Sequence, residues 1–241
     1  MDTLTLIGFG ETGWGALMLM AALMTLAVTA TALVIGAIFG AAVASAKLSG
    51  NRLLSVLGHA YTTVFRGIPE LLVIYFVYFG GSSAVTAFGQ WLGYDGFLGM
   101  PSFIAGALAV GIISGAYQAE VYRGSFLAIS KGELEAAAAI GMSRSLRFRR
   151  VILPQVFRLS IPGIGYVWQL SLKDSALVSV IGIAELMRTS QVAAGSTRQY
   201  FLFYIVGGVL YLLLTSLSDR VFNGAERQAN KSMPSATMGK A

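Results

Sequence analysis

The sequence predicts an all-α, polytopic membrane protein with five transmembrane helices. Hydrophobic residues make up 56% of its 241 residues and charged residues only 12%, about half of the charged fraction that is usual in a soluble domain. Mean hydropathy is +0.71, and long apolar stretches alternate with basic segments. A chain with this composition is expected to cross a bilayer several times.

Each crossing of the hydrocarbon core needs roughly 20 mostly apolar residues. The first expected span, residues 15–46, is longer than this and is expected to tilt or protrude. The 29 glycines are frequent within the apolar stretches, where small residues let helix backbones approach closely. Together the spans are expected to form one transmembrane domain, followed by a disordered tail at 229–241. The remaining expected spans are residues 62–80, 101–127, 160–183 and 199–217.

The lysines and arginines are distributed unevenly between the two sides that these spans define. Most fall between spans one and two, between spans three and four, or after span five. The opposite side carries only Arg188 and Arg198 outside the spans. Because cytoplasmic loops are enriched in Lys and Arg, we expect an external N-terminus and a cytoplasmic C-terminus. The net charge of +6 therefore indicates membrane orientation rather than nucleic-acid binding.

Several chemistries have no basis in the sequence. The chain has no cysteine and one histidine, too few residues of these types for a thiol nucleophile or a typical zinc site. No Gly-x-x-x-x-Gly-Lys-Ser/Thr phosphate loop is present, so we expect no ATP site in this chain. No His-Glu-x-x-His or Gly-x-Ser-x-Gly motif indicates an intramembrane hydrolase. The chain is therefore not expected to be an enzyme or to bind a metal or cofactor itself.

The largest cytoplasmic loop, residues 128–158, contains "KGELEAAAAIGMSRSLRFRRVILPQ". Its Ala, Leu and Glu residues favour a helix, which Gly141 can end. Ser143 can cap a second short helix, and Pro154 is expected to disturb it. A basic amphipathic segment can bind anionic lipid. However, alanines bury little apolar area, so this turn better suits insertion into a groove of a partner protein.

The spacing within this loop resembles the EAA motif of bacterial ABC importer permeases. That motif reads Glu-Ala-Ala, three residues, Gly, nine residues, Ile, one residue, Leu-Pro, and here Val151 replaces the isoleucine. The segments "FRGIPELLVIYF" and "LPQVFRLSIPGIGYVWQLSLKDSALVSVIG" resemble the polar amino-acid subfamily. Within it, the likeness is to permeases for histidine, lysine, arginine and ornithine, or for octopine. The matching motif residues are Glu135, Ala136, Ala137, Gly141, Leu153 and Pro154.

The resemblance implies an ABC importer type I permease fold in the bacterial inner membrane. It also implies that the EAA loop is a coupling helix, which docks in a cleft of a cytoplasmic ATPase. The expected partners are a second permease subunit, identical or related, two ATPase subunits that bind ATP and Mg²⁺, and a periplasmic substrate-binding protein. The N-terminus would then be periplasmic.

Charged residues inside the expected spans are candidates for the solute pathway, because such charges are costly unless they are paired or hydrated. Carboxylates on Glu70, Asp174 and Glu185 could receive a cationic side chain, and Trp168 could line the route. The segment "RGIPE" resembles that of basic amino-acid importers, which favours a basic amino acid or an opine over glutamine or glutamate.

Structural roles for these charges remain open at this point. Glu120 and Arg123 have the i,i+3 spacing of an ion pair on one helix. Asp174 could pair with another helix to hold the bundle together, and Trp168 could simply pack. A secondary transporter that works alone is a further alternative, and the lack of an inverted repeat argues against it.

Overall fold

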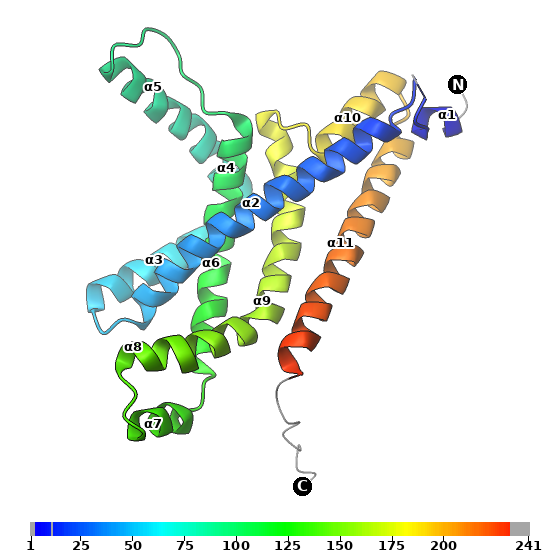
Figure 1. Ribbon diagram of the computed structural model, residues 1–241. Coiled ribbons are helices and arrows are strands. Elements are labelled where there is room, and N and C mark those ends of the chain that lie inside the picture. The colour runs from blue at the N-terminus through cyan, green and yellow to red at the C-terminus, as the bar shows by residue number, and fades with distance from the viewer. Residues whose placement is uncertain (1–2, 11, 232–241) are drawn as a thin grey trace.

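The computed structural model describes residues 3–10 and 12–231, and every regular element in them is helical (Figure 1). The longest helices cross one another in a bundle, and short helices lie at both of its ends. The bounds are α1 Thr3–Ile7, α2 Gly15–Leu48, α3 Arg52–Gly67, α4 Glu70–Tyr75, η1 Phe76–Gly80, α5 Gly81–Trp91, α6 Ser102–Leu127, α7 Lys131–Ala139, α8 Arg144–Arg147, η2 Phe148–Ile152, α9 Leu153–Asp174, η3 Ser175–Ile181, α10 Leu186–Thr197 and α11 Tyr200–Asn230.

Four helices in the described residues are long and apolar enough to cross a membrane: Gly15–Leu48, Glu70–Trp91, Ser102–Leu127 and Tyr200–Asn230. The first, third and fourth of these cover the expected spans 15–46, 101–127 and 199–217 almost completely. The expected spans 62–80 and 160–183 differ from the helices that the structure contains, for different reasons.

The expected range 62–80 includes a break in the helix. Here α3 ends at Gly67, and α4 begins at Glu70 after Pro69. Proline has no N–H to donate and disfavours helical geometry in the residue before it, and Ile68 is accordingly extended, with ψ of 150°. Beyond the break, α4, η1 and α5 form one continuous helix to Trp91, so the apolar helix starts and ends later than the sequence suggested.

The expected range 160–183 falls on α9 and the 3₁₀ helix η3, which ends at Gly182 with φ of 90°. Arg158, Lys173 and Asp174 make α9 less apolar than the four long helices, although it packs in the bundle against α6, α11 and α2. The expected tail also begins later than predicted, because α11 continues to Asn230. The rest of that tail, residues 232–241, lies outside the described residues.

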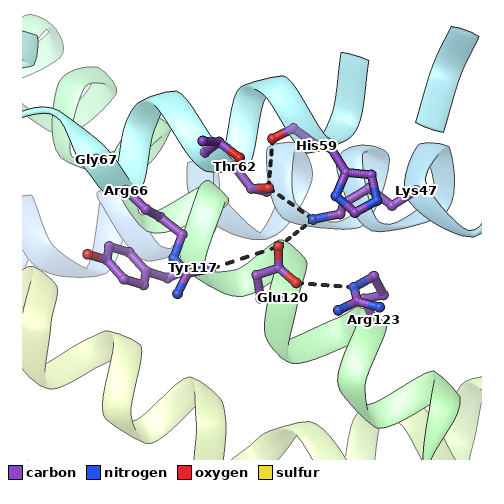
Figure 2. Close-up of a pocket in the computed structure, with 9 residues that line it drawn as sticks. Lys47, His59, Thr62, Arg66, Gly67, Tyr117, Glu120 and Arg123 are labelled. Carbon is purple, nitrogen blue, oxygen red and sulfur yellow. Dashed lines mark hydrogen bonds and ion pairs between the residues drawn. The ribbon is translucent and has the colours of Figure 1, made fainter. Parts of the chain in front are cut away.

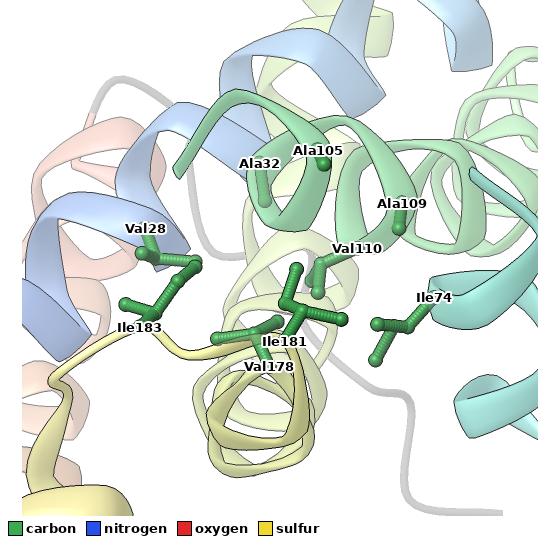
Figure 3. Close-up of a cluster of buried hydrophobic side chains, with 9 residues drawn as sticks. All are labelled: Val28, Ala32, Ile74, Ala105, Ala109, Val110, Val178, Ile181 and Ile183. Carbon is green, nitrogen blue, oxygen red and sulfur yellow. The ribbon is translucent and has the colours of Figure 1, made fainter. Parts of the chain in front are cut away.

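The core forms where α2 and α6 cross. Its largest cluster of buried apolar side chains joins these two helices to α4 and η3 (Figure 3). Glycine permits the close approach: a Cβ on Gly115 of α6 would lie 2.8 Å from Cβ of Phe39 on α2. Gln118 then donates from Nε2 to the Leu33 carbonyl of α2 at 3.0 Å. Small residues and interhelical hydrogen bonds of this kind hold helices together in lipid.

The two ends of the bundle carry different elements (Figure 1). Helices α1, α5 and α10 lie at one end, and α7 and α8 project from the other. The loop that the sequence assigns to the cytoplasm is therefore at the opposite end from the N-terminal helix.

Candidate functional site

The alanine-rich helix α7 ends in a tight turn at a glycine, and backbone hydrogen bonds close this turn. Gly141 has φ of +80°, a left-handed conformation that glycine adopts without steric cost. Its N–H donates to the Ala138 carbonyl at 3.0 Å, and the N–H of Met142 donates to the Ala137 carbonyl at 3.1 Å. These two bonds form a Schellman motif, which satisfies carbonyls that the end of a helix leaves free. The predicted role of Gly141 in ending the helix is confirmed.

Ser143 starts the second helix of the loop, as predicted. Its hydroxyl accepts a hydrogen bond from the N–H of Leu146 at 3.3 Å. Two side chains then fasten the loop to itself: Arg147 Nη1 donates to the Leu134 carbonyl at 3.4 Å, and Gln155 Nε2 donates to Glu133 Oε2 at 2.5 Å. We call residues 131–155 the elbow. Because its two arms are joined at two points, the elbow can transmit force as one body.

Helix α7 presents a row of alanines to solvent, with the carboxylate of Glu135 beside it. Glu135 and Ala136 are exposed, as is Ile140, while Ala137 is buried. The surface that Ala136, Ala138 and Ala139 form on α7 therefore carries only small side chains. Such a helix fits a groove on another protein, with the carboxylate free to meet a basic group there.

Leu153 and Pro154 lie where the elbow joins the long helix α9. Pro154 was expected to disturb the helix, and the turn before it is a π-helix, η2, at Phe148–Ile152. The proline nitrogen cannot donate and its ring would clash with a carbonyl in ordinary α-helical spacing, a conflict that local π-helical spacing relieves. The helix is not interrupted, so α8, η2 and α9 run without a break from Arg144 to Asp174.

Glu70 and Asp174 approach each other from different helices, although 104 residues of sequence separate them. Glu70 is the first residue of α4 and Asp174 is the last of α9. Both side chains are partly buried, and the charge of Glu70 acts on Asp174. Both charges also act on Tyr117 of α6. The structure thus places two of the predicted pathway residues within electrostatic range of each other, and a pair of carboxylates favours a cation.

The other two predicted pathway residues have clear structural contacts. Glu185 is fully buried and caps α10, accepting from the N–H groups of Met187 at 2.8 Å and Arg188 at 2.7 Å. Tyr211 also donates its hydroxyl to Glu185 at 2.9 Å. Trp168 packs on Phe222 of α11, with ring centroids 6.0 Å apart. Because both carboxylate oxygens of Glu185 are occupied, we do not include it in the pathway proposed below.

An ion cluster that the sequence did not predict joins α2, α3 and α6 (Figure 2). Glu120 pairs with Arg123 on its own helix, as the spacing predicted, with Nε 3.1 Å from Oε2. It also pairs with Lys47, whose Nζ donates to Thr62 as well at 2.9 Å. Arg66 Nη1 lies 3.8 Å from Glu120 Oε1. Lys47 and Arg66 lie far from Glu120 in sequence, so no local spacing could have identified these pairs.

A pocket of about 420 Å³ opens beside this cluster. Its lining includes the four charged residues of the cluster (Figure 2). No group of three or more metal-binding side chains lies together anywhere in residues 3–10 and 12–231. The lining residues are Lys47, His59, Thr62, Thr63, Arg66, Gly67, Tyr117, Glu120 and Arg123.

Comparisons with known proteins agree with the EAA resemblance. Residues 32–230 match the family described as "Binding-protein-dependent transport system inner membrane component". The octopine transport system permease protein OccQ of Rhizobium meliloti is 51% identical over 233 residues, which cover 97% of this chain and 98% of that protein. The histidine/lysine/arginine/ornithine transport system permease protein HisQ of Escherichia coli is 38% identical, covering 90% of this chain and 94% of that protein.

A solved structure has the same fold. The crystal structure of an amino acid ABC transporter with histidines contains a chain that superposes with a TM-score of 0.78. It is 31% identical in sequence, and the match covers 95% of this chain and 99% of that one. The helical bundle described above is therefore the fold of an ABC importer permease. The chain belongs to the family of binding-protein-dependent transport system inner membrane components, which are the permease subunits of ABC importers.

Proposed function

We propose that this chain and a second permease subunit form the inner-membrane pathway for a basic amino acid or an opine. The observation that carries this proposal is the approach of Glu70 and Asp174 beside Tyr117. Two carboxylates would repel the side chain of glutamate and offer a neutral amide little, whereas they attract a guanidinium or an ammonium group. The names of OccQ and HisQ support the same substrate class.

The proposed topology has five crossings, with α9 and η3 forming the fifth beside the four long apolar helices. The N-terminus is then periplasmic and the elbow cytoplasmic, as the distribution of Lys and Arg indicates. The permease partner is related or identical, and the two subunits pack about a twofold or pseudo-twofold axis. Two copies of a separate ATPase, which binds ATP and Mg²⁺, lie below the elbows, and a periplasmic binding protein delivers the solute above.

The elbow is the proposed connection to the ATPase. Glu135 and Ala136 enter the cleft of the ATPase, Ala137 packs on the inner side of the elbow, and Gly141 gives the turn its shape. Leu153 and Pro154 join this turn to α9. When ATP closes the ATPase dimer, the elbows are drawn together, and ATP binding favours one arrangement of the permease helices over the other.

The unbroken helix from Arg144 to Asp174 explains how this motion reaches the solute. Movement of the elbow displaces the far end of α9 as a rigid lever. Asp174 lies at that end, whereas Glu70 lies on α4, so the two carboxylates shift relative to each other. The pathway would thereby bind a cation in one state and release it in the other.

Uptake of labelled arginine and octopine into cells that express the complete importer tests this proposal. Glu70→Gln and Asp174→Asn should each reduce the transport rate about tenfold, because each removes a charge-assisted contact worth about 1.5–3 kcal/mol. Asp219→Asn is the matched control: Asp219 accepts from Gln169 on a different pair of helices, and an asparagine can still accept. Unchanged rates in both test variants, or glutamine carried in preference to arginine, would reject the proposal.

A further inference from the structure

We propose that Arg66 receives a carboxylate of the transported solute in the pocket between α3 and α6, with Lys47 and Arg123 holding the surrounding positive charge. This inference rests on the proposed function and extends it. Glu70 and Asp174 bind the cationic end of the solute, and Arg66 binds its anionic end. The substrate class is then a molecule with both a cationic side chain and a carboxylate.

The ion cluster contains more positive than negative charge. Lys47, Arg66 and Arg123 all lie against the single carboxylate of Glu120. An excess of positive charge within a membrane-spanning bundle is costly unless an anion or water compensates it. The cluster is therefore suited to bind a further anion, and the adjoining pocket supplies the space.

Arg66 is the cation that is available for such an anion. Lys47 is 1% exposed and already donates to Glu120 and Thr62. Arg66 is 44% exposed, and at 3.8 Å its contact with Glu120 is too long for a hydrogen bond. Within the described residues its guanidinium donates no hydrogen bond, so its fork of N–H groups can bind a carboxylate in bidentate geometry.

Arg66 and the two carboxylates share one aromatic neighbour, Tyr117. The Arg66 Cζ lies 5.3 Å from the ring centroid of Tyr117, on which the charges of Glu70 and Asp174 also act. The α3–α4 break at residues 68–69 places Arg66 near the end of one helix and Glu70 at the start of the next. A basic amino acid carries both kinds of group that such an arrangement would bind, because its carboxylate lies at one end and its cationic side chain ends at the other.

The pocket is large enough for this part of a solute. Its volume of about 420 Å³ lies within the usual range for small-molecule sites, roughly 300–1,000 Å³. The phosphate of an anionic phospholipid is also negatively charged and can also bind arginine in bidentate geometry. Tyr117 lines the pocket and lies within electrostatic range of Glu70 and Asp174, which favours the solute. The choice of bilayer in the experiment distinguishes the two.

The test combines a change in the protein with a change in the solute. The assembled importer, without nucleotide, is placed in nanodiscs of phosphatidylcholine, which contain no anionic headgroup. Calorimetry measures the affinity for L-arginine and for agmatine, which is arginine without its carboxylate. Arg66→Gln should weaken arginine binding about tenfold or more, as expected for loss of a charge-assisted pair, and leave agmatine binding unchanged. Glu70→Gln should weaken the binding of both molecules.

Arg52→Gln is the matched control, since Arg52 lies on the same helix outside the pocket and undergoes the same loss of charge. It should alter neither affinity. Retained agmatine binding shows that the Arg66→Gln complex is folded. The inference is overturned if Arg66→Gln weakens the binding of arginine and agmatine equally, or weakens neither. It is also overturned if the unaltered complex does not bind arginine, or if the effect of Arg66→Gln appears only in bilayers with phosphatidylglycerol. A selective Arg66→Gln effect with no Glu70→Gln effect would uphold this inference and reject the proposed cation site instead.

Discussion

Lys47 of α2 and Glu120 of α6 form an ion pair that spans 73 residues of sequence. Because Lys47 also bonds to Thr62 of α3, this single ammonium group fastens three helices together. Its side chain is almost completely buried, so neither water nor lipid headgroups can replace the carboxylate.

Replacing Glu120 tests how much the ion pair contributes to stability. Glu120→Gln leaves Lys47 buried without a counter-charge, a loss that typically costs about 3–5 kcal/mol. We expect the assembled importer to melt at a temperature several degrees lower when unfolding is followed by intrinsic fluorescence.

The matched control removes both charges. The double variant Lys47→Met, Glu120→Leu should recover part of the lost stability, because it removes the buried ammonium group that Glu120→Gln leaves without a counter-charge. Arg66 and Arg123, which are partly exposed, lose the carboxylate in both variants. If the Glu120→Gln complex melted at the same temperature as the unaltered complex, a stabilising role for the pair would be contradicted.

Substitutions of Gly141 test whether ATPase association depends on the turn of the elbow. A side chain at φ of +80° costs about 1–2 kcal/mol, while no atom would obstruct the added Cβ. Gly141→Ala should therefore weaken co-purification of the ATPase, and Gly141→Asn should weaken it less, because asparagine tolerates this conformation. Gly132→Ala, at an ordinary position of α7, should leave association intact. Equal association of Gly141→Ala and Gly132→Ala would show that the turn is not needed.

Substitution of Glu185 distinguishes a role in stability from a role in the solute pathway. Glu185→Ala removes the cap of α10 and leaves the Tyr211 hydroxyl without its acceptor. Each loss costs about 1–2 kcal/mol, so thermal stability should fall. The ratio of arginine to glutamine uptake should stay unchanged in the complexes that remain folded. If the ratio of arginine to glutamine uptake changed while thermal stability did not, Glu185 would belong to the solute pathway.

Local sequence predicted the features that depend on neighbouring residues. Gly141, Ser143 and the Glu120–Arg123 pair all lie within a few residues of their partners, so spacing and helix-capping preferences were sufficient. The break at Pro69 follows from the same local rules, yet the apolar run across it concealed the end of α3. The fourth expected span also differs from α9 and η3, because Arg158, Lys173 and Asp174 make α9 less apolar than the four long helices.

Contacts between distant helices could not be predicted in this way. Nothing near Lys47 or Arg66 indicates that they meet Glu120, because the packing of α2 and α3 against α6 decides it. Similarly, the hydrogen bond from the Tyr211 hydroxyl to Glu185 depends on how α10 packs against α11. The sequence thus identifies a charged residue in a membrane helix as a candidate functional residue, and only the tertiary fold identifies the residue with which it pairs.

The most direct test of the account is arginine accumulation in proteoliposomes that contain the permease subunits, with binding protein outside and ATP inside. The account predicts uphill accumulation that requires the ATPase subunit and is lost with Glu135→Lys in the elbow, while Glu226→Lys near the end of α11 transports normally. Accumulation without the ATPase, driven by a proton gradient alone, or normal accumulation with Glu135→Lys would contradict coupling through the elbow.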